Sequence, residues 1–205
     1  SCTVKAYYAL KLIGDKPEEQ HMKMARDAIH SWGGAARSNV FTRITLALFE
    51  QIPWRGVPCL PVECMLLPRW FPFHILKISY WSRTVMIPLL ILYHYKPKAE
   101  NPCKISITEL FITPPNEEKN YFLIRSRLNH VFLLIDNMVR FLSPFIPKAI
   151  HNRALKKAES WMIERLNGND GLGGIFPAMV NAYEALVLMK INASIHYGIP
   201  MLFKG

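Results

Sequence analysis

Apolar residues recur at helical spacing through most of this chain, and glycine or proline interrupts them at helix-length intervals. The first three apolar segments end at Gly14, at the pair Gly33-Gly34 and at Pro53. Glycine favours the left-handed conformation that closes a helix, and proline cannot continue one. This spacing predicts an all-α fold. A chain of 205 residues that is 51% hydrophobic is also large enough to bury a sizeable core.

Helix-sized segments account for most of the sequence. Asp15 is a suitable N-cap for the second segment, Ser38 or Asn39 for the third, and Pro88 predicts a kink in the fourth. Residues 53–72 include five prolines, which favours short turns. We expect helices at residues 3–13, 15–32, 39–52, 75–95, 121–141, 148–166 and 176–189, with a long polar connection at 96–120 that holds one short apolar turn at 110–112.

Two parts of the chain are similar to one another. Residues 25–49 and residues 158–189 each read as two helices joined through a glycine pair. Repeated helical hairpins of this kind build solenoids or closed α/α toroids. The internal similarity therefore favours a fold assembled from helical hairpins.

The net charge of +10 suggests an anionic partner, which could be nucleic acid, a phosphate-bearing substrate or a membrane surface. Many of the cations fall in one region: Arg125, Arg127, Arg140, Lys148, Arg153, Lys156 and Lys157. They form either a solvated face or a basic collar beside a membrane-inserted surface. The alternative function is a helical-repeat binding module whose basic face meets nucleic acid or an acidic partner. The large rings lie mainly in residues 64–95, away from the cations, which weakens this alternative.

Local patterns of catalytic or metal-binding residues are absent from the sequence. The four aspartates lie far apart, and the seven histidines form neither an HExxH nor an HxH pattern, so the sequence predicts no metal site. The glycine-rich stretch 171–174 joins two expected helices, which indicates a tight corner rather than a phosphate loop. The four cysteines have no CxxC spacing, which favours reduced thiols in a cytosol-facing protein.

Large aromatic residues are frequent for a domain of this size: Phe41, Trp70, Phe71, Phe73, Tyr80, Trp81 and Phe176. They are either ordinary core residues or the lining of a cavity for an apolar or cationic substrate, since ring faces stabilise cations. The longest uncharged apolar stretch, residues 85–95, is shorter than the roughly 20 residues that cross a bilayer. This region therefore predicts buried helices or an interfacial surface.

Five stretches resemble a known family in sequence and in order. They are TVKAYYALKLIGD (3–15), NVFTRITLALFEQIPW (39–54), FPFHILKISYWSRTV (71–85), YFLIRSRLNHVFLLIDNMVRFLSPFIPKAI (121–150) and GNDGLGGIFPAMVNAYEAL (168–186). Together they resemble the N-terminal half of the squalene–hopene cyclases, which are class II triterpene cyclases. The resemblance extends to about residue 190.

The resemblance implies that residues 1–205 are a fragment, mostly of the family's inserted α/α barrel (toroid) domain, and that the barrel is partial. It implies a monotopic membrane protein on the cytoplasmic face of the bacterial inner membrane, with residues 121–150 as the docking segment. Its substrate would be squalene, cyclised through carbocations to hopene or hopanol without a cofactor or metal. Nucleic acid is not an expected partner, and a homodimer is compatible with the resemblance.

The resemblance also assigns roles to particular residues. Substrate-cavity residues of the family match Trp81 and Phe41, cavity-wall residues match Ile175 and Pro177, and residues that narrow the access channel match Ile78 and Met86.

Two departures from the family pattern bear on activity. The family's general acid lies in a DxDD motif that this sequence lacks, so we expect no catalytic residue here and an acid located beyond Gly205. The chain alone is therefore expected to be inactive. The glycine turn is also a degenerate QW repeat, with Leu166 in place of the usual Gln and Leu172 in place of the usual Trp.

Overall fold

The computed structural model describes residues 1–71, 74–118, 121–122, 127–166 and 172–197, the side chains of 127–129 and 191–197 excepted. The chain forms two compact units. Unit 1 comprises Ser1–Pro58 and Lys98–Asp136, and unit 2 comprises Cys59–Pro97 and Asn137–Gly205. Within the described ranges the structure is helical and contains no β-strand, only an isolated bridge between Leu166 and Leu172. The predicted all-α class is confirmed.

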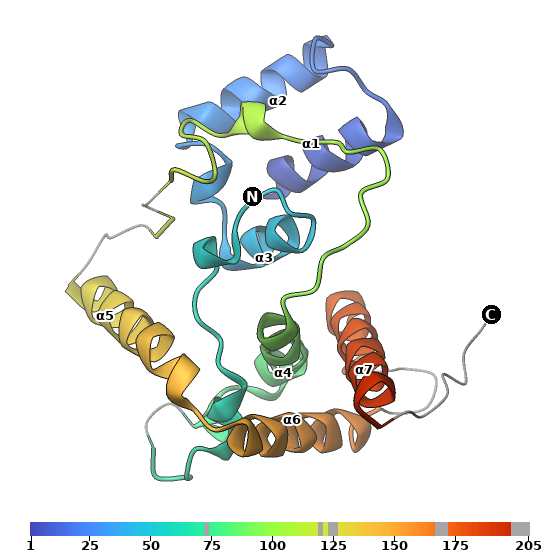
Figure 1. The fold of residues 1–205 in the computed structure, drawn as a ribbon. Helices are drawn as coiled ribbons and strands as arrows, with labels where there is room; N and C mark the ends of the chain where they lie inside the picture. The colour runs from blue at the N-terminus through green and yellow to red at the C-terminus, as the bar shows by residue number, and fades with distance from the viewer. Residues whose placement is uncertain (72–73, 119–120, 123–126, 167–171, 198–205) are drawn as a thin grey trace. The chain divides into compact units, whose positions relative to one another are not determined.

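Unit 1 is built from the N-terminal helices and from the later segment Lys98–Asp136, which returns to pack on them. Its elements are α1 (Cys2–Ile13), α2 (Gln20–Ser31), η1 (Ala35–Arg37), α3 (Val40–Leu48), η2 (Trp54–Gly56), η5 (Thr108–Leu110) and the start of α5 (Arg127–Leu142). The helix α1 packs against α2 and α3, and α2 packs against η5, as Figure 1 shows. Tyr7 and Met22 are fully buried among these helices.

Local signals set the helix ends in unit 1. Gly14 closes α1 with φ +122°, a conformation that side chains disfavour. The side chain of Asn39 caps α3 by accepting a hydrogen bond from the Thr42 amide at 2.8 Å, as predicted. Asp15 does not cap α2, which begins five residues later. Its carboxylate instead contacts His21 Nε2 at 2.9 Å.

The connection at 96–120 is more deeply packed than its polar sequence suggests. Ile107 and Leu110 are fully buried and Phe111 nearly so, whereas Ile112 of the expected apolar turn is 65% exposed. The Ile107 amide donates to Oε1 of Gln51 at 3.0 Å, and the Gln51 side-chain amide donates to the Ile105 carbonyl at 3.2 Å. One buried glutamine thus ties this connection to the end of α3.

Unit 2 contains most of the remaining helices. Its elements are η3 (Val62–Leu66), η4 (Ile75–Lys77), α4 (Tyr80–Tyr95), the end of α5, η6 (Ser143–Phe145), α6 (Lys148–Ile163) and α7 (Phe176–Tyr197). The helix α4 lies beside α7 and also packs against α6 and η3 (Figure 1). Ile87, Ile91, Met162 and Ala185 are fully buried in this core. Alanine on α7 lets its backbone approach the larger side chains of α4 closely.

Besides α2, two further helices begin later than predicted. The fourth helix starts at Tyr80 rather than at residue 75, because Ser79 caps it by accepting from the Ser82 amide, and a separate turn, η4, precedes it. The fifth starts at Arg127 rather than at residue 121. Tyr121 is buried and lies outside any helix instead, and its hydroxyl donates to the Pro115 carbonyl at 2.6 Å. Tertiary hydrogen bonding thus overrides the helical pattern at this position.

Candidate functional site

Five of the six predicted site residues lie in unit 2. Trp81 and Met86 are on α4, Ile78 precedes it, and Ile175 and Pro177 are at the start of α7. The two helices pack along one another, so these five residues lie on, or directly before, the two helices of one pair. Phe41 belongs to unit 1.

Trp81 is the most prominent ring of this helix pair. It lies in the first turn of α4, and its side chain is 57% exposed. Its ring centroid is 6.1 Å from that of Tyr80, with the two rings nearly perpendicular. Edge-to-face pairs of this kind fix ring orientation. The start of α4 therefore presents a large indole face that the rest of the described chain leaves open.

The glycine turn before α7 is held against α4 one turn after Trp81. Gly173 has φ +70°, and a β-carbon there would lie 3.2 Å from Cγ2 of Thr84. Thr84 is fully buried, and its hydroxyl donates to the Trp81 carbonyl at 2.8 Å. The glycine thus permits the close approach that sets Ile175 and Pro177 beside α4.

Further aromatic and cationic groups at this site were not anticipated from the sequence. The ring centroid of Trp161, on α6, lies 6.5 Å from that of Tyr80. The guanidinium of Arg83 lies 5.9 Å from the Tyr80 ring centroid, and that of Arg165 lies 4.4 Å from the Trp161 ring. No motif links these residues, because α4 and α6 meet only in the folded unit.

The other unit 2 site residues differ in exposure. Ile78, Met86 and Ile175 are half-buried, whereas Pro177 is exposed in the first turn of α7. The Ile175 carbonyl accepts from the Met179 amide at 3.0 Å and so belongs to the hydrogen-bonded start of that helix. These apolar side chains can border an apolar ligand, and none supplies a proton-transfer group.

Phe41 sits on the exposed side of α3, with 56% of its side chain accessible. Ile44, one turn further along α3, is buried and Leu48 is half-buried, whereas Phe41 itself is exposed. An exposed ring is compatible with the ligand-contacting role that the resemblance implies, and it is not part of the unit 1 core.

One group of three potential metal ligands occurs among the described residues. Ligand atoms of Asp15, Glu19 and His21 lie within 4.8 Å of one another. His21 and Glu19 are exposed, and the His21 ring already contacts the Asp15 carboxylate. The group lies in unit 1, whereas the aromatic site lies in unit 2, and the chemistry of the aromatic site does not require it.

The unit 2 site can contact an apolar or cationic ligand rather than perform acid–base chemistry. The faces of Trp81 and Tyr80 carry negative potential, which attracts a cation by up to about 2 kcal/mol when water is excluded. The one half-buried carboxyl on α7, Glu184, has a pKa raised by burial, and it lies two turns beyond Pro177.

Comparison with known proteins gives a consistent result over nearly the whole chain. The family model for the squalene–hopene cyclase N-terminal domain matches residues 1–196. The squalene–hopene cyclase of Bradyrhizobium diazoefficiens is 46% identical over 199 residues, which cover 91% of this chain and 29% of that protein. The squalene–hopene cyclase of Schizosaccharomyces japonicus is 47% identical over 194 residues, covering 94% of this chain and 29% of that protein.

A more distant relative is named as a different synthase. The dammaradiene synthase of Dryopteris crassirhizoma is 29% identical over 191 residues, which cover 93% of this chain and 27% of that protein. In each case the chain spans less than a third of the relative's length.

Proposed function

Because this chain belongs to the squalene–hopene cyclase N-terminal domain family, we propose that it supplies part of the substrate-cavity wall of an enzyme that cyclises squalene. In that reaction a terminal alkene of squalene is protonated. Neighbouring double bonds then attack the resulting cation in turn and close the rings, and proton loss or water capture ends the cascade. The role of the residues described above is to hold the apolar chain and to stabilise the travelling positive charge.

The observation that carries this proposal is the ring pair at the start of α4. Trp81 is 57% exposed, stands against Tyr80, and lies next to the turn that Gly173 packs onto Thr84. An apolar ring that is open on a rigid helix pair is suited to contacting a hydrocarbon and to stabilising a nearby carbocation. The same helix pair carries Ile175 and Pro177.

The chain alone is proposed to be inactive on squalene. Its sequence contains no DxDD motif, and the described site residues offer no strong acid for protonating an alkene. We further propose that the enzyme needs no metal or cofactor for this step, since an acid and a shaped apolar cavity suffice. The piece would then contribute binding and charge stabilisation to chemistry that begins elsewhere in the enzyme.

Membrane contact is proposed for α5 and the turn that follows it. Apolar side chains of this segment are strongly exposed: Val131 52%, Phe132 56%, Leu134 65%, Met138 56%, Phe141 71% and Phe145 72%. An exposed apolar face of this size is typical of a docking surface. None of the described helices is long and apolar enough to cross a bilayer. The proposal is therefore a segment that lies in one membrane leaflet.

To test the cavity role, this chain replaces the matching segment in the squalene–hopene cyclase of Bradyrhizobium diazoefficiens, which gives a chimeric enzyme. The chimera should convert squalene to a pentacyclic product, whereas the isolated chain should not. In the chimera Trp81→Ala should lower kcat/KM by about tenfold or more, from loss of one cation–π contact and its packing. Trp70→Ala removes another exposed tryptophan, 78% accessible, and should leave kcat/KM near that of the parent chimera.

Two results would contradict the proposal. One is turnover of squalene by the isolated chain, which would show that an acid is present in it. The other is an equal loss of kcat/KM in the Trp81 and Trp70 variants of a folded chimera, which would remove the special role of the ring pair.

A further inference from the structure

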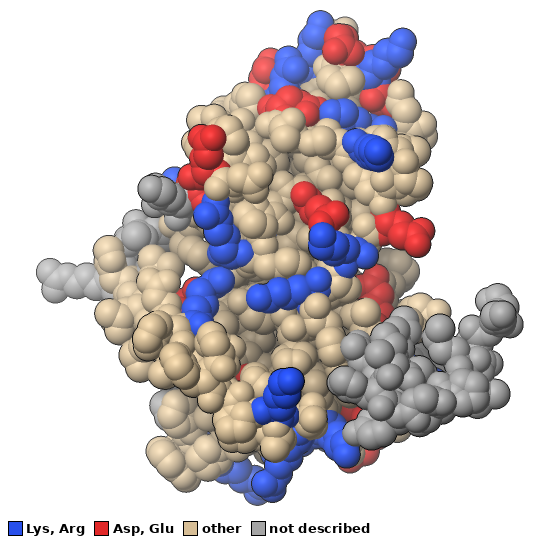
Figure 2. All heavy atoms as spheres, viewed as in Figure 1, with Lys and Arg blue, Asp and Glu red and all other residues tan. Residues whose placement is uncertain are grey.

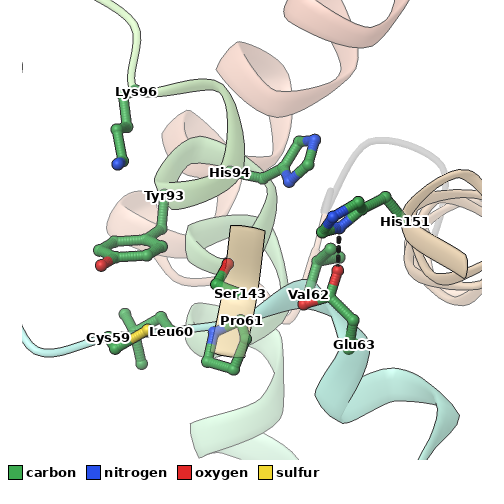
Figure 3. A pocket seen from close by; sticks show the side chains of 10 residues that line it. All are labelled: Cys59, Leu60, Pro61, Val62, Glu63, Tyr93, His94, Lys96, Ser143 and His151. Carbon is green, nitrogen blue, oxygen red and sulfur yellow. Dashed lines mark hydrogen bonds and ion pairs between the residues drawn. The ribbon is translucent and has the colours of Figure 1, made fainter. Parts of the chain in front are cut away.

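Two histidines far apart in the sequence meet in unit 2, away from the aromatic site. His94 lies in the last turn of α4 and His151 in the first turn of α6, and Figure 3 shows the two rings approaching one another. Their centroids are 5.2 Å apart and their planes are tilted by 45°. Both rings border a cavity of about 80 Å³.

The carboxylate of Glu63, on η3, fixes the tautomer of His151. Nδ1 of His151 contacts Oε1 of Glu63, as the dashed line in Figure 3 marks. A carboxylate only accepts hydrogen bonds, so the ring donates from Nδ1 and its Nε2 is left to face another partner. A histidine that donates one nitrogen to a carboxylate and offers the other outward is the arrangement that metal-binding histidines adopt.

The separation of the two rings suits a shared ion. Zn²⁺ binds imidazole nitrogen at about 2.0–2.1 Å with tetrahedral angles, which places the centroids of two ligating rings about 5 Å apart. The observed separation between His94 and His151 is 5.2 Å. Among the described residues none forms a hydrogen bond with the His94 ring, whose contacts are with the Tyr95 and His151 rings.

We propose that His94 and His151 form a two-histidine site for a divalent transition-metal ion of the Zn²⁺ or Cu²⁺ class, with Glu63 orienting His151. The cavity leaves room for water to complete the coordination. An ion bound there cross-links the end of α4 to the start of α6. Imidazole ligands favour these ions over Mg²⁺ and Ca²⁺, and affinity should follow the order Cu²⁺ above Ni²⁺ and Zn²⁺.

The neighbouring groups are compatible with this assignment. The ammonium of Lys96 borders the same cavity and opposes a cation, and the Glu63 carboxylate offsets it. Cys59 lines the same cavity, so the Cys59→Ser variant below distinguishes a thiol ligand from the two histidines.

The site is independent of the proposed cyclase role, and its test does not use activity. Calorimetric titration of the 205-residue chain with ZnCl₂, after removal of metals by a chelator, should show one strong equivalent. His94→Gln and His151→Gln should each weaken it at least about tenfold, and Glu63→Gln by roughly tenfold. The matched control is His21→Gln, in the exposed group with Asp15 and Glu19, and it should leave the affinity unchanged. Cys59→Ser should also leave it unchanged.

Equal Zn²⁺ affinity in the parent chain and in folded His94→Gln and His151→Gln variants would overturn the proposal. So would loss of binding in His21→Gln or in Cys59→Ser. A second readout covers variants that fail to fold. In the unsubstituted chain with ¹⁵N-labelled histidine, substoichiometric Cu²⁺ should broaden the ring signals of two histidines first. Broadening of all histidines together, or of His21 alone, would exclude this site.

Discussion

At the scale of the residue, one buried arginine organises unit 1. Arg43 is 5% exposed, and its Nη1 donates to the carbonyls of Gly56 and Tyr121, both at 2.8 Å. The guanidinium lies 4.8 Å from the ring centroid of Phe122, and burial lowers its pKa. The arginine satisfies two backbone groups that would otherwise be buried without a partner, and it holds residues 121–122 in place.

Arg43→Ala should therefore destabilise the protein. Leaving two buried carbonyls unpaired costs about 1–3 kcal/mol each, so we expect the free energy of unfolding to fall by roughly 2–6 kcal/mol. Urea denaturation followed by circular dichroism measures this change. The exposed Arg153 on α6 provides the control, and its replacement by Ala should shift stability by less than about 0.5 kcal/mol. Equal urea midpoints for the two variants would contradict this account of Arg43.

Glu109 gives a pH-dependent contribution in the same unit. Burial alone would raise the pKa of its carboxyl, but hydrogen bonds from Lys11 and Tyr7 and the Lys11 charge bring the pKa below its ordinary value of 4.5. The Tyr7 hydroxyl donates to Oε1 at 3.1 Å. A carboxyl with a lowered folded-state pKa stabilises the fold fully above pH 4.5, and the contribution is lost as pH falls through the folded pKa.

Glu109→Gln should consequently lower the free energy of unfolding by roughly 1 kcal/mol at pH 7. The gap between the two proteins should close as pH falls below 4.5, because the carboxyl of the unsubstituted protein is then protonated as well. Urea unfolding of both at pH 7, 5 and about 3.5 measures the gap. A gap that is constant, or that widens in acid, would show that the Lys11 and Tyr7 contacts do not act through the ionised form.

At the scale of the element, the glycine turns are where backbone and packing meet. Gly34 has φ +79°, and a β-carbon there would lie 3.2 Å from the Leu110 carbonyl oxygen. Gly14 also has positive φ, +122°, but a β-carbon there would meet nothing within 4 Å. Both positions require a positive φ. Of the two, only Gly34 also lies close to the backbone of η5.

Gly34→Ala should therefore cost more stability than Gly14→Ala. Both substitutions place a side chain at positive φ, which costs about 1–3 kcal/mol, and Gly34→Ala must also displace backbone at Leu110. Thermal unfolding should show the lower Tm for Gly34→Ala. If Gly14→Ala had the lower Tm, the contact between the turn and η5 would not be a determinant of stability.

The helix α5 supports a second element-scale prediction. Burying a phenylalanine side chain in the membrane interface contributes about 1.5–3 kcal/mol, so Phe141→Ser should weaken binding to phosphatidylcholine vesicles about tenfold or more. Phe141 is 71% exposed in solution, so the substitution should leave stability nearly unchanged. Co-sedimentation measures the binding. Ile163→Ser, at a 54% exposed position on α6, is the matched control and should bind like the parent.

At the scale of the whole molecule, the helices and the family together establish the fold class. The net positive charge is a separate property of the molecule. Helical hairpins within an all-α chain agree with the α/α toroid type of its family. On the face shown in Figure 2, Lys and Arg are spread among Asp and Glu rather than gathered in one patch. On this face the cations do not gather into the single patch that a nucleic-acid groove requires, and the net charge of +10 still attracts the chain to anionic surfaces.

Vesicles that contain anionic lipid should accordingly bind the chain more tightly than phosphatidylcholine vesicles. Raising salt to about 0.5 M should remove that difference, because the Debye length falls to a few ångströms, and should leave the apolar component of binding intact. The measurement is co-sedimentation at low and high salt, beside a duplex oligonucleotide titration at the same salt. Binding to the oligonucleotide that survives high salt, without vesicle binding, would favour the helical-repeat module instead.

The sequence by itself determined the features that depend on neighbouring residues. Helix periodicity, the Asn39 cap and the glycine corners are local signals, and residue identity in five ordered stretches was enough to recognise the family. It did not place the buried face of α3, because exposure of Phe41 depends on what packs there.

Only the tertiary structure decided which distant residues meet. The sequence carries no periodic signal that Arg43 will donate a hydrogen bond to the Tyr121 carbonyl. The approach of His94 to His151 likewise arises because α4 and α6 pack together. Contacts of this kind depend on the folding of the whole unit, since their partners are separated by many residues and follow no spacing rule.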